Sequence, residues 1–200
     1  MDGRLQQVLN FWFGDNWHDA AVTAKTQGKI WWQKSTQTDS EIRHRFAELL
    51  DEEMQDRLQD QRAPEALLAR IILTDQMTRN MFRGQPQSFA CDERARWLSG
   101  QLLERDDYVQ LPLIAQVFVF MPLEHSERLA DQQMCLQYFQ ALVERADPAQ
   151  KGLFRDYLNY AQKHLEIIER FGRFPHRNAI VGRDSTREEQ DFLRQPGSSF

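Results

Sequence analysis

Several features of common protein classes are scarce in this chain of 200 residues. It has two cysteines, Cys91 and Cys135, which lie far apart and form no C-x-x-C pair. We therefore expect reduced, buried thiols, and neither a disulfide framework nor a zinc knuckle. The net charge is −5, whereas proteins that grip nucleic acid usually show a basic surplus on their binding face. The sequence predicts no nucleic-acid partner.

Long apolar runs are also missing. The longest run, residues 111–123, contains Gln116 and two prolines, and it is shorter than the roughly 18 residues that a membrane-spanning helix needs. The first residues, 1–4, lead into an amphipathic stretch without an apolar signal core. We therefore expect no membrane partner and a cytoplasmic location.

Short motifs that mark common enzymes are absent as well. The chain contains no G-x-S-x-G, H-E-x-x-H, G-x-G-x-x-G or phosphate-loop motif, which disfavours the common nucleotide enzymes. No grouping of histidine, cysteine and acid has the spacing of a metal site. We expect no metal and no cofactor, while the sequence leaves open whether the chain is an enzyme and which oligomer it forms.

The chain is rich in apolar rings and in arginine. Hydrophobic residues make up 41% of it and include 13 Phe and 5 Trp, which is enough for a well-filled core. Among the cations, arginine far outnumbers lysine. The planar fork of arginine pairs with carboxylates and phosphates through two hydrogen bonds, so anionic partners of either kind fit this composition.

Apolar residues recur at helical spacing along nearly the whole chain, which predicts an all-α fold of about nine helices. Short loops would arrange neighbouring helices as antiparallel pairs. Residues 111–121 are apolar on every side and are expected to form a central helix, with a buried strand as the alternative. The expected helices cover residues 5–13, 22–34, 38–54, 64–82, 88–106, 111–121, 126–146, 148–171 and 186–193.

Local signals mark several helix ends. Thr38-Asp39-Ser40-Glu41 and Ser185-Thr186-Arg187-Glu188 fit capping boxes, in which a glutamate follows the capping hydroxyl by three residues. Gly14 and Gly172 are placed as C-terminal stops. No repeat and no linker is visible, so we expect one helical domain over residues 1–194 and a frayed tail over residues 195–200.

The first of three polar segments lies at the end of the expected helix 64–82. Asp75 and Arg79 are four residues apart on a helix face and can pair. The alternative is a solvated last turn whose arginines face the negative end of the helix dipole. The candidate ligand-binding residues of this segment are Asp75, Gln76, Arg79, Asn80 and Arg83.

The second polar segment, residues 120–132, leads from a buried helix into a polar loop. Glu124 and His125 are candidate catalytic residues because a carboxyl and an imidazole can exchange protons near neutral pH. Asp131 is a candidate ligand-binding residue. The alternative is an ordinary helix start, with acids near the positive end of the dipole.

The third polar segment, residues 170–178, is the densest, with three Arg, one His and one Asn. Arginine forks with Asn and His donors suit a carboxylate or phosphate, and a bent loop on a rigid scaffold is a common place for binding groups. The alternative is a loop whose arginines tie helix ends together. The candidate ligand-binding residues are Arg173, His176, Arg177 and Asn178, and His164 and His176 are further candidate catalytic residues.

These segments resemble a bacterial family, domain-of-unknown-function family 924. The matching pieces are Val8-Leu9-Asn10-Phe11-Trp12-Phe13-Gly14, Asp75-Gln76 through Phe82-Arg83-Gly84, Pro122-Leu123-Glu124-His125-Ser126-Glu127 with Asp131-Gln132, and His164 through Phe171-Gly172-Arg173-Phe174-Pro175-His176-Arg177-Asn178 to Gly182-Arg183. The resemblance implies an α-α superhelix of stacked helix pairs, similar to tetratricopeptide-repeat proteins, and brings no settled activity. The chain departs from the family at Thr78, where members tend to carry proline, which leaves the local helix geometry open.

Three functions fit these residues. The favoured one is a binding module that receives a small anionic molecule or an acidic peptide on a concave helical face. The second is an enzyme that acts on a small anionic substrate, with His125, His164 or His176 moving protons. The third is a purely structural network of ion pairs that pins helices together. We expect the three polar segments to converge on one site.

Overall fold

Helices make up all the regular structure in residues 1–15 and 17–198, the part of the chain described by the computed structural model. Its helices are α1 (Gly3–Phe13), α2 (Ala20–Trp32), α3 (Thr36–Met54), α4 (Pro64–Ile71), α5 (Thr78–Met81), α6 (Asp92–Leu103), α7 (Leu113–Glu124), α8 (Leu129–Arg145), α9 (Lys151–Phe171) and α10 (Arg187–Leu193). A π-helical segment, Ile72–Met77, joins α4 to α5 in one continuous rod. The predicted all-α class is confirmed.

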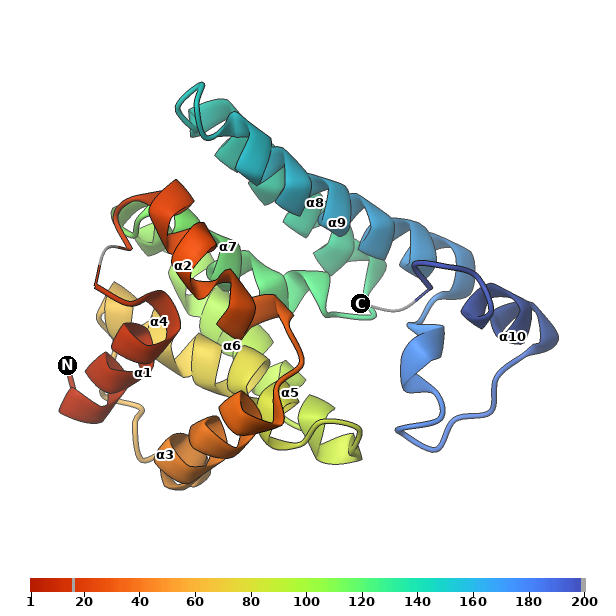
Figure 1. Cartoon of the computed structure of the whole chain (residues 1–200), viewed down its shortest axis with the longest axis horizontal. Helices are drawn as coiled ribbons and strands as arrows, with labels where there is room; N and C mark the ends of the chain where they lie inside the picture. Colours follow the sequence, from red (N-terminus) through yellow and green to blue (C-terminus); the bar gives the residue numbers. More distant parts are fainter. Residues whose placement is uncertain (16, 199–200) are drawn as a thin grey trace.

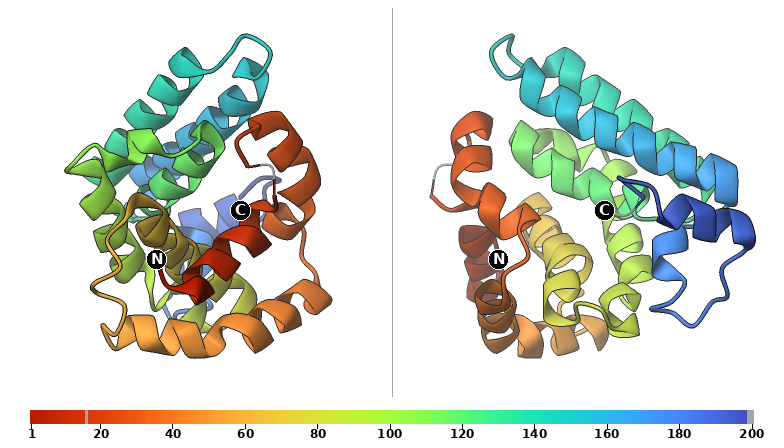
Figure 2. Two further views of the ribbon diagram at one scale, coloured as in Figure 1. Left: turned by 90° about the vertical axis from the view of Figure 1, so that its left-hand side faces the viewer. Right: turned by 45° about the vertical axis from the view of Figure 1, so that its right-hand side comes forward.

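The helices form a main body, a long hairpin and a smaller C-terminal part (Figure 1). Helices α1 to α7 build the main body, and α8 and α9 run antiparallel along one side of it. Helix α10 lies near the far end of α9, as the turned views of Figure 2 also show. No helix in the described part of the chain has the length and apolar character to cross a bilayer. The superhelical stacking implied by the family resemblance stays a prediction.

The core is organised around α7. Every residue of this helix from Ile114 to Glu124 is buried, so the predicted central helix is confirmed and the alternative of a strand is wrong. Aromatic rings of the N-terminal helices pack against Phe118, with Trp12 and Phe13 both edge-on to its ring. The indole nitrogen of Trp31 donates a hydrogen bond of 2.9 Å to the carbonyl oxygen of Trp12, so a buried polar atom is satisfied where α2 meets α1.

Both cysteines are free and buried, as expected. Cys91 precedes α6 and Cys135 lies within α8.

The helix ends confirm the glycine signals and correct both capping boxes. Gly14 and Gly172 end α1 and α9, each with a φ of 67°, a conformation that glycine adopts without strain. The cap of α3 is Ser35 and not Thr38, because Ser35 is the last extended residue and its hydroxyl accepts from the Thr38 N–H. The second box begins one residue later than predicted, at Thr186.

Residues 195–198 pack back against the end of α10. The N–H of Gln195 donates to the carbonyl oxygen of Phe192 at 2.9 Å. Ser198 is buried, and its hydroxyl donates to the carbonyl oxygen of Leu193 at 3.1 Å. Of the predicted frayed tail, residues 199–200 lie outside the described residues. The single domain over residues 1–194 stays a prediction.

A buried ion pair joins α3 to α4. The guanidinium of Arg70 donates to both carboxylate oxygens of Glu53, at 2.6 and 2.9 Å, and both side chains are almost completely buried. Arg94 from α6 donates to the same carboxylate at 2.7 Å. Since a buried carboxylate without a partner is costly, this pairing makes the position of α4 sensitive to the loss of either charge.

Replacing Arg70 by methionine tests this pairing. We expect Arg70→Met to lower the free energy of unfolding by about 3 kcal/mol, because Glu53 then stays buried with only one cation. The control is Arg105→Met, which removes an exposed arginine paired with Asp107 and should cost less than about 1 kcal/mol. Urea denaturation measures both values, and equal losses in the two variants would contradict the prediction.

Candidate functional site

The carboxylate of Asp75 is the point at which the three polar segments meet. Asp75 lies in the π-helical segment and is completely buried. Its Oδ1 is 2.8 Å from Nδ1 of His125, which follows α7, and 3.5 Å from the guanidinium of Arg79 in α5. Arg177, from the loop after α9, donates to the carbonyl oxygen of His125 at 3.0 Å. Residues of all three polar segments therefore meet here, although other predicted site residues lie elsewhere.

The π-helical segment explains how an acid comes to lie inside the rod formed by α4 and α5. A π-helical turn is wider than an α-helical turn, and such turns occur often at functional sites. The amide of Gln76 donates to the other oxygen of Asp75, Oδ2. Thr78, unlike a proline, keeps its backbone N–H. Its hydroxyl donates to the carbonyl oxygen of Thr74 at 2.8 Å. The helix therefore continues through this position without a break.

Asp75 is ionised and His125 is neutral at pH 7. Burial acts to raise the pKa of Asp75, but the hydrogen bond and charge of His125 and the cation of Arg79 outweigh it and lower that pKa to about 2. Burial lowers the pKa of His125 below its ordinary value of 6.5, and the attraction of Asp75 offsets this only in part. The result is a fixed anion beside an uncharged imidazole.

The contact with Asp75 determines which nitrogen of His125 carries the proton. An ionised carboxylate only accepts hydrogen bonds, so Nδ1 of His125 must donate to it. The lone pair of the neutral ring then lies on Nε2. This second nitrogen has no hydrogen-bond partner among residues 1–15 and 17–198. His125 thus offers an unoccupied basic nitrogen at the site.

A cavity of about 240 Å³ lies beside this imidazole. Asp92 pairs with Arg79 and Arg177 at 2.9 and 3.1 Å. The other two carboxylates of the lining, Glu93 and Glu127, are also paired with arginines. The cavity is lined by Asp92, Glu93, Arg96, Pro122, His125, Ser126, Glu127, Arg128 and Arg177.

Two arginines of this lining each have a nitrogen that donates no hydrogen bond within the described part of the chain. Arg177 is 8% exposed and lies between the rings of Phe89 and Phe174, with its guanidinium carbon 4.7 and 4.6 Å from their centroids. Burial and the nearby Arg79 lower the pKa of Arg177 to about 10, so it stays cationic at pH 7. Nε of Arg177 and Nε of Arg96 are buried and have no hydrogen-bond partner in the described part of the chain.

A second buried pair lies behind His125. Glu124 and His164 are 3.0 Å apart, and the ring of His164 is 6.3 Å from that of His125 between centroids. Burial raises the pKa of Glu124 to about 8, with a further contribution from Asp75. Burial also lowers the pKa of His164 to about 3. Near pH 6 both groups are therefore uncharged, and the negative charge of the buried centre stays on Asp75.

His176 lies on the same side of the fold, and its ring is 5.6 Å from that of Phe174. Burial and the adjacent Arg177 lower the pKa of His176 to about 4. This histidine is therefore neutral at pH 7, and it is not part of the lining of the cavity.

Comparison with known proteins assigns the chain to a family. A family model described as a bacterial protein of unknown function, DUF924, matches residues 8–197. This chain belongs to the DUF924 family. The chain is similar to a solved structure of a protein of unknown function from Agrobacterium tumefaciens, with 29% sequence identity and a TM-score of 0.81. The match covers 96% of this chain and 97% of that one. No curated protein matches the DUF924 chain.

Two predicted site residues of the DUF924 chain lie in a different place, against α3. The amide of Asn80 and the guanidinium of Arg83 both donate to the carboxylate of Asp39 at 2.8 Å. The two hydrogen bonds of Arg83 lower the pKa of Asp39 against the opposing effect of burial. These residues join α5 to α3 and do not reach the cavity beside His125.

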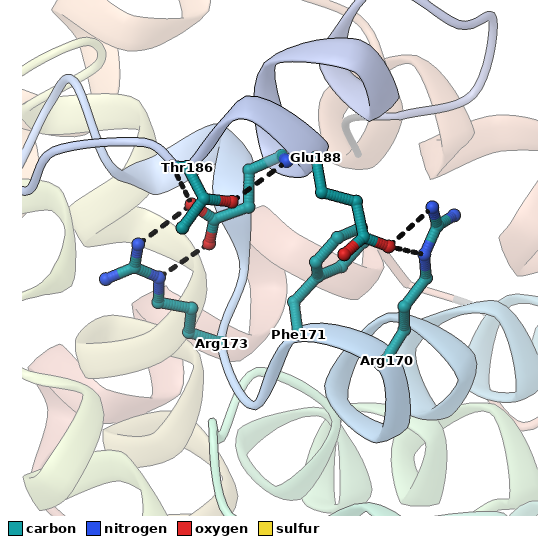
Figure 3. Close-up of a pocket in the computed structure, with 6 residues that line it drawn as sticks. Arg170, Phe171, Arg173, Thr186 and Glu188 are labelled. Atoms are coloured by element: carbon teal, nitrogen blue, oxygen red, sulfur yellow. Dashed lines mark hydrogen bonds and ion pairs between the residues drawn. The ribbon is translucent and has the colours of Figure 1, made fainter.

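Two more predicted site residues hold α10. Arg173 donates to both carboxylate oxygens of Glu189, at 2.6 and 2.8 Å (Figure 3). Asn178 donates to the same carboxylate at 3.3 Å. Arg170 pairs with Glu188 beside them. A hollow of about 390 Å³ lies here, but the charged groups that line it already pair with one another. This hollow is larger than the cavity beside His125, but it presents fewer unpaired polar groups to a ligand.

Asp131 lies next to the cavity. It accepts a hydrogen bond of 2.6 Å from the hydroxyl of Ser126 and is 3.8 Å from Nε of Arg96. Asp92 and Arg96, both in α6, were missed by the sequence analysis. Acids and arginines on an exposed helix face are common, so no local signal distinguishes these two from their neighbours.

The buried carboxyl of Glu124 makes a pH-dependent contribution to stability. Since its pKa rises from 4.5 in the unfolded chain to about 8 in the fold, the folded state holds a proton that the unfolded state releases between these values. The stability from this group is therefore complete below pH 4.5 and is lost as the pH rises to 8.

Replacing Glu124 by glutamine should remove the loss of stability between pH 4.5 and pH 8, because glutamine does not titrate. We expect Glu124→Gln and the parent protein to be similar in stability at pH 5, and the variant to be more stable at pH 8 by on the order of 2 kcal/mol. Urea denaturation at both pH values measures the difference. The control is Glu144→Gln on the exposed face of α8, which should leave the pH dependence unchanged. A parallel pH dependence for all three proteins would contradict the prediction.

Proposed function

We propose that the DUF924 chain binds a small molecule with a carboxylate or phosphate group in the cavity beside His125. The observation that carries the proposal is the buried Nε of Arg177, a donor of a cationic group that no described residue accepts from. A buried donor without a partner is costly in a folded protein. An anionic oxygen in the cavity would accept from it and recover that cost.

The surroundings of Arg177 support an anion at this place. Its guanidinium is held by Asp92, by the carbonyl oxygen of His125 and by two aromatic rings. It therefore meets a ligand in a fixed orientation, which reduces the entropy lost on binding. Arg96 adds to the same lining a second buried Nε that donates no hydrogen bond to a described residue, although it is 3.8 Å from Asp131. Both arginines contribute to the lining of one cavity, and arginine donors are suited to the oxygens of an anionic group.

The size of the cavity favours a small molecule over an acidic peptide. At about 240 Å³ it lies below the usual range of roughly 300–1,000 Å³ for sites that hold drug-sized ligands. A peptide would need an extended groove in its place. The proposal therefore narrows the ligand to a compact anion.

A structural role accounts for the remaining polar residues. Three predicted site residues each donate a hydrogen bond to an acidic side chain of a helix: Arg83 to Asp39 of α3, and Arg173 and Asn178 to Glu189 of α10. These contacts explain why the arginine-rich segments extend well beyond the cavity. They are a second function for the same motifs and not a competing one.

Titration with simple anions tests the proposal. We expect inorganic phosphate or acetate to raise the Tm of the parent protein by a few degrees, because a ligand at ten times its dissociation constant stabilises the fold by about 1.4 kcal/mol. For Arg96→Gln, the anion concentration needed for the same rise in Tm should be at least about tenfold higher. Thermal melting at constant ionic strength, with chloride as the balancing anion, measures it.

The control for this titration is Arg105→Gln, which changes the net charge equally at an exposed position remote from the cavity lining. It should respond to phosphate as the parent protein does. If no anion raises the Tm more than chloride does, or if both arginine variants respond alike, the proposed binding site is wrong.

A further inference from the structure

Among the groups that line the cavity, His125 is the one equipped to accept a proton. The carboxylates of Asp92 and Glu127 are each paired with an arginine, at 2.9 and 2.6 Å. The carboxylate of Glu93 is paired with two arginines, Arg96 and Arg128. Ser126 donates its hydroxyl hydrogen to Asp131 at 2.6 Å, so its proton is directed at that carboxylate and not at the imidazole of His125. The neutral Nε2 of His125 remains, with a lone pair and no described partner.

Asp75 stabilises the protonated ring of His125 against the burial that disfavours it. A proton on Nε2 would give an imidazolium whose Nδ1–H still donates to ionised Asp75, 2.8 Å away. Asp75 is completely buried, so water does not weaken this attraction. Because the hydrogen bond already exists in the neutral state, the ring needs no reorientation when it becomes charged. Asp75 is therefore a positioning residue for His125.

We propose that His125 is the general base of a hydrolytic site in this cavity, and that its substrate is a small carboxylic ester that carries an anionic group. This inference rests on the proposed function, since Arg177 and Arg96 would hold the anionic group or the oxygen that becomes negative. The cavity is open to solvent, so it can admit water as the nucleophile.

The proton and electron balance of the step is simple. Nε2 takes a proton from water, and the electron pair of that O–H bond forms the new bond from oxygen to the carbonyl carbon. The carbonyl oxygen becomes an oxyanion, for which the arginine donors are suitable partners. When the tetrahedral intermediate collapses, the bond to the alcohol oxygen breaks, and the imidazolium returns its proton to that oxygen. The products are a carboxylic acid, which releases its proton to water at neutral pH, and an alcohol, and no other reagent is consumed.

A pair of chromogenic esters tests the inference. 4-Nitro-3-acetoxybenzoate carries a carboxylate, and 2-nitrophenyl acetate is its neutral counterpart with the same leaving-group geometry. We expect the protein to hydrolyse the anionic ester faster than the neutral one relative to their uncatalysed rates. His125→Gln should reduce kcat for the anionic ester about 100-fold, the low end of the effect of a general base. His44→Gln, at an exposed position in α3, is the matched control and should be unchanged.

The pH profile provides a second readout. The rate should rise with pH through the pKa of His125, below 6.5, and then level off, because only the neutral ring accepts a proton. Asp75→Asn should lower kcat more than it changes KM and should shift this profile, since it alters the charge beside Nδ1 without touching the substrate. The titratable and charged groups around His125 are Asp75, Arg79, Arg177, His164, His176 and its neighbour Glu124, together with Asp92, Glu93, Arg96, Glu127 and Arg128 of the cavity lining.

The outcomes separate this inference from the binding proposal. If phosphate raises the Tm but neither ester is hydrolysed above background, or if His125→Gln hydrolyses the anionic ester as fast as the parent, the catalytic inference is wrong and the binding site stands. If hydrolysis depends on His125 but phosphate neither inhibits it nor raises the Tm, the anion site is wrong. Melting curves of each variant confirm that it is folded at the assay temperature.

Discussion

The buried charge of Asp75 is the constraint on which the rest of the site depends. An ionised carboxylate in the interior is tolerated only when it is paired and hydrogen-bonded. Gln76 comes from its own segment, but His125 comes from a position 50 residues further along the chain. Burying Asp75 therefore requires the end of α7 to lie against the π-helical segment, and the residues of both segments are buried.

The contacts around Asp75 close into a ring. Asp75 attracts Arg79, Arg79 donates to Asp92, Asp92 accepts from Arg177, Arg177 donates to the backbone of His125, and His125 returns to Asp75. The members come from the central rod, from α6, and from the segments that follow α7 and α9. In such a closed network each charge has partners on both sides, so the removal of one member is felt by all the others.

Local signals predicted the helices and the polar segments, whereas the partners of individual side chains could not be predicted. Residues 111–121 are apolar on every side, and this property alone placed α7 in the core. The first capping box failed because Ser35 and Thr38 both carry suitable hydroxyls, and only the backbone shows which of the two is extended. Arg83 and Arg177 look alike in sequence, yet one pairs with Asp39 near the surface and the other lines the cavity. That difference arises from the tertiary fold.

The C-terminal part of the chain matters to the site because it controls where Arg177 lies. Glu127, in the cavity lining, accepts from the backbone N–H of Phe174 at 2.8 Å and from Arg183 at 2.6 Å. These bonds fix both ends of the turn that carries Arg177. Glu189 of α10 holds the same loop from its outer side through Arg173. Under the proposed anion binding, the ion pairs that looked purely structural would also serve the site, since a guanidinium that meets an anion in one orientation needs a loop that does not move.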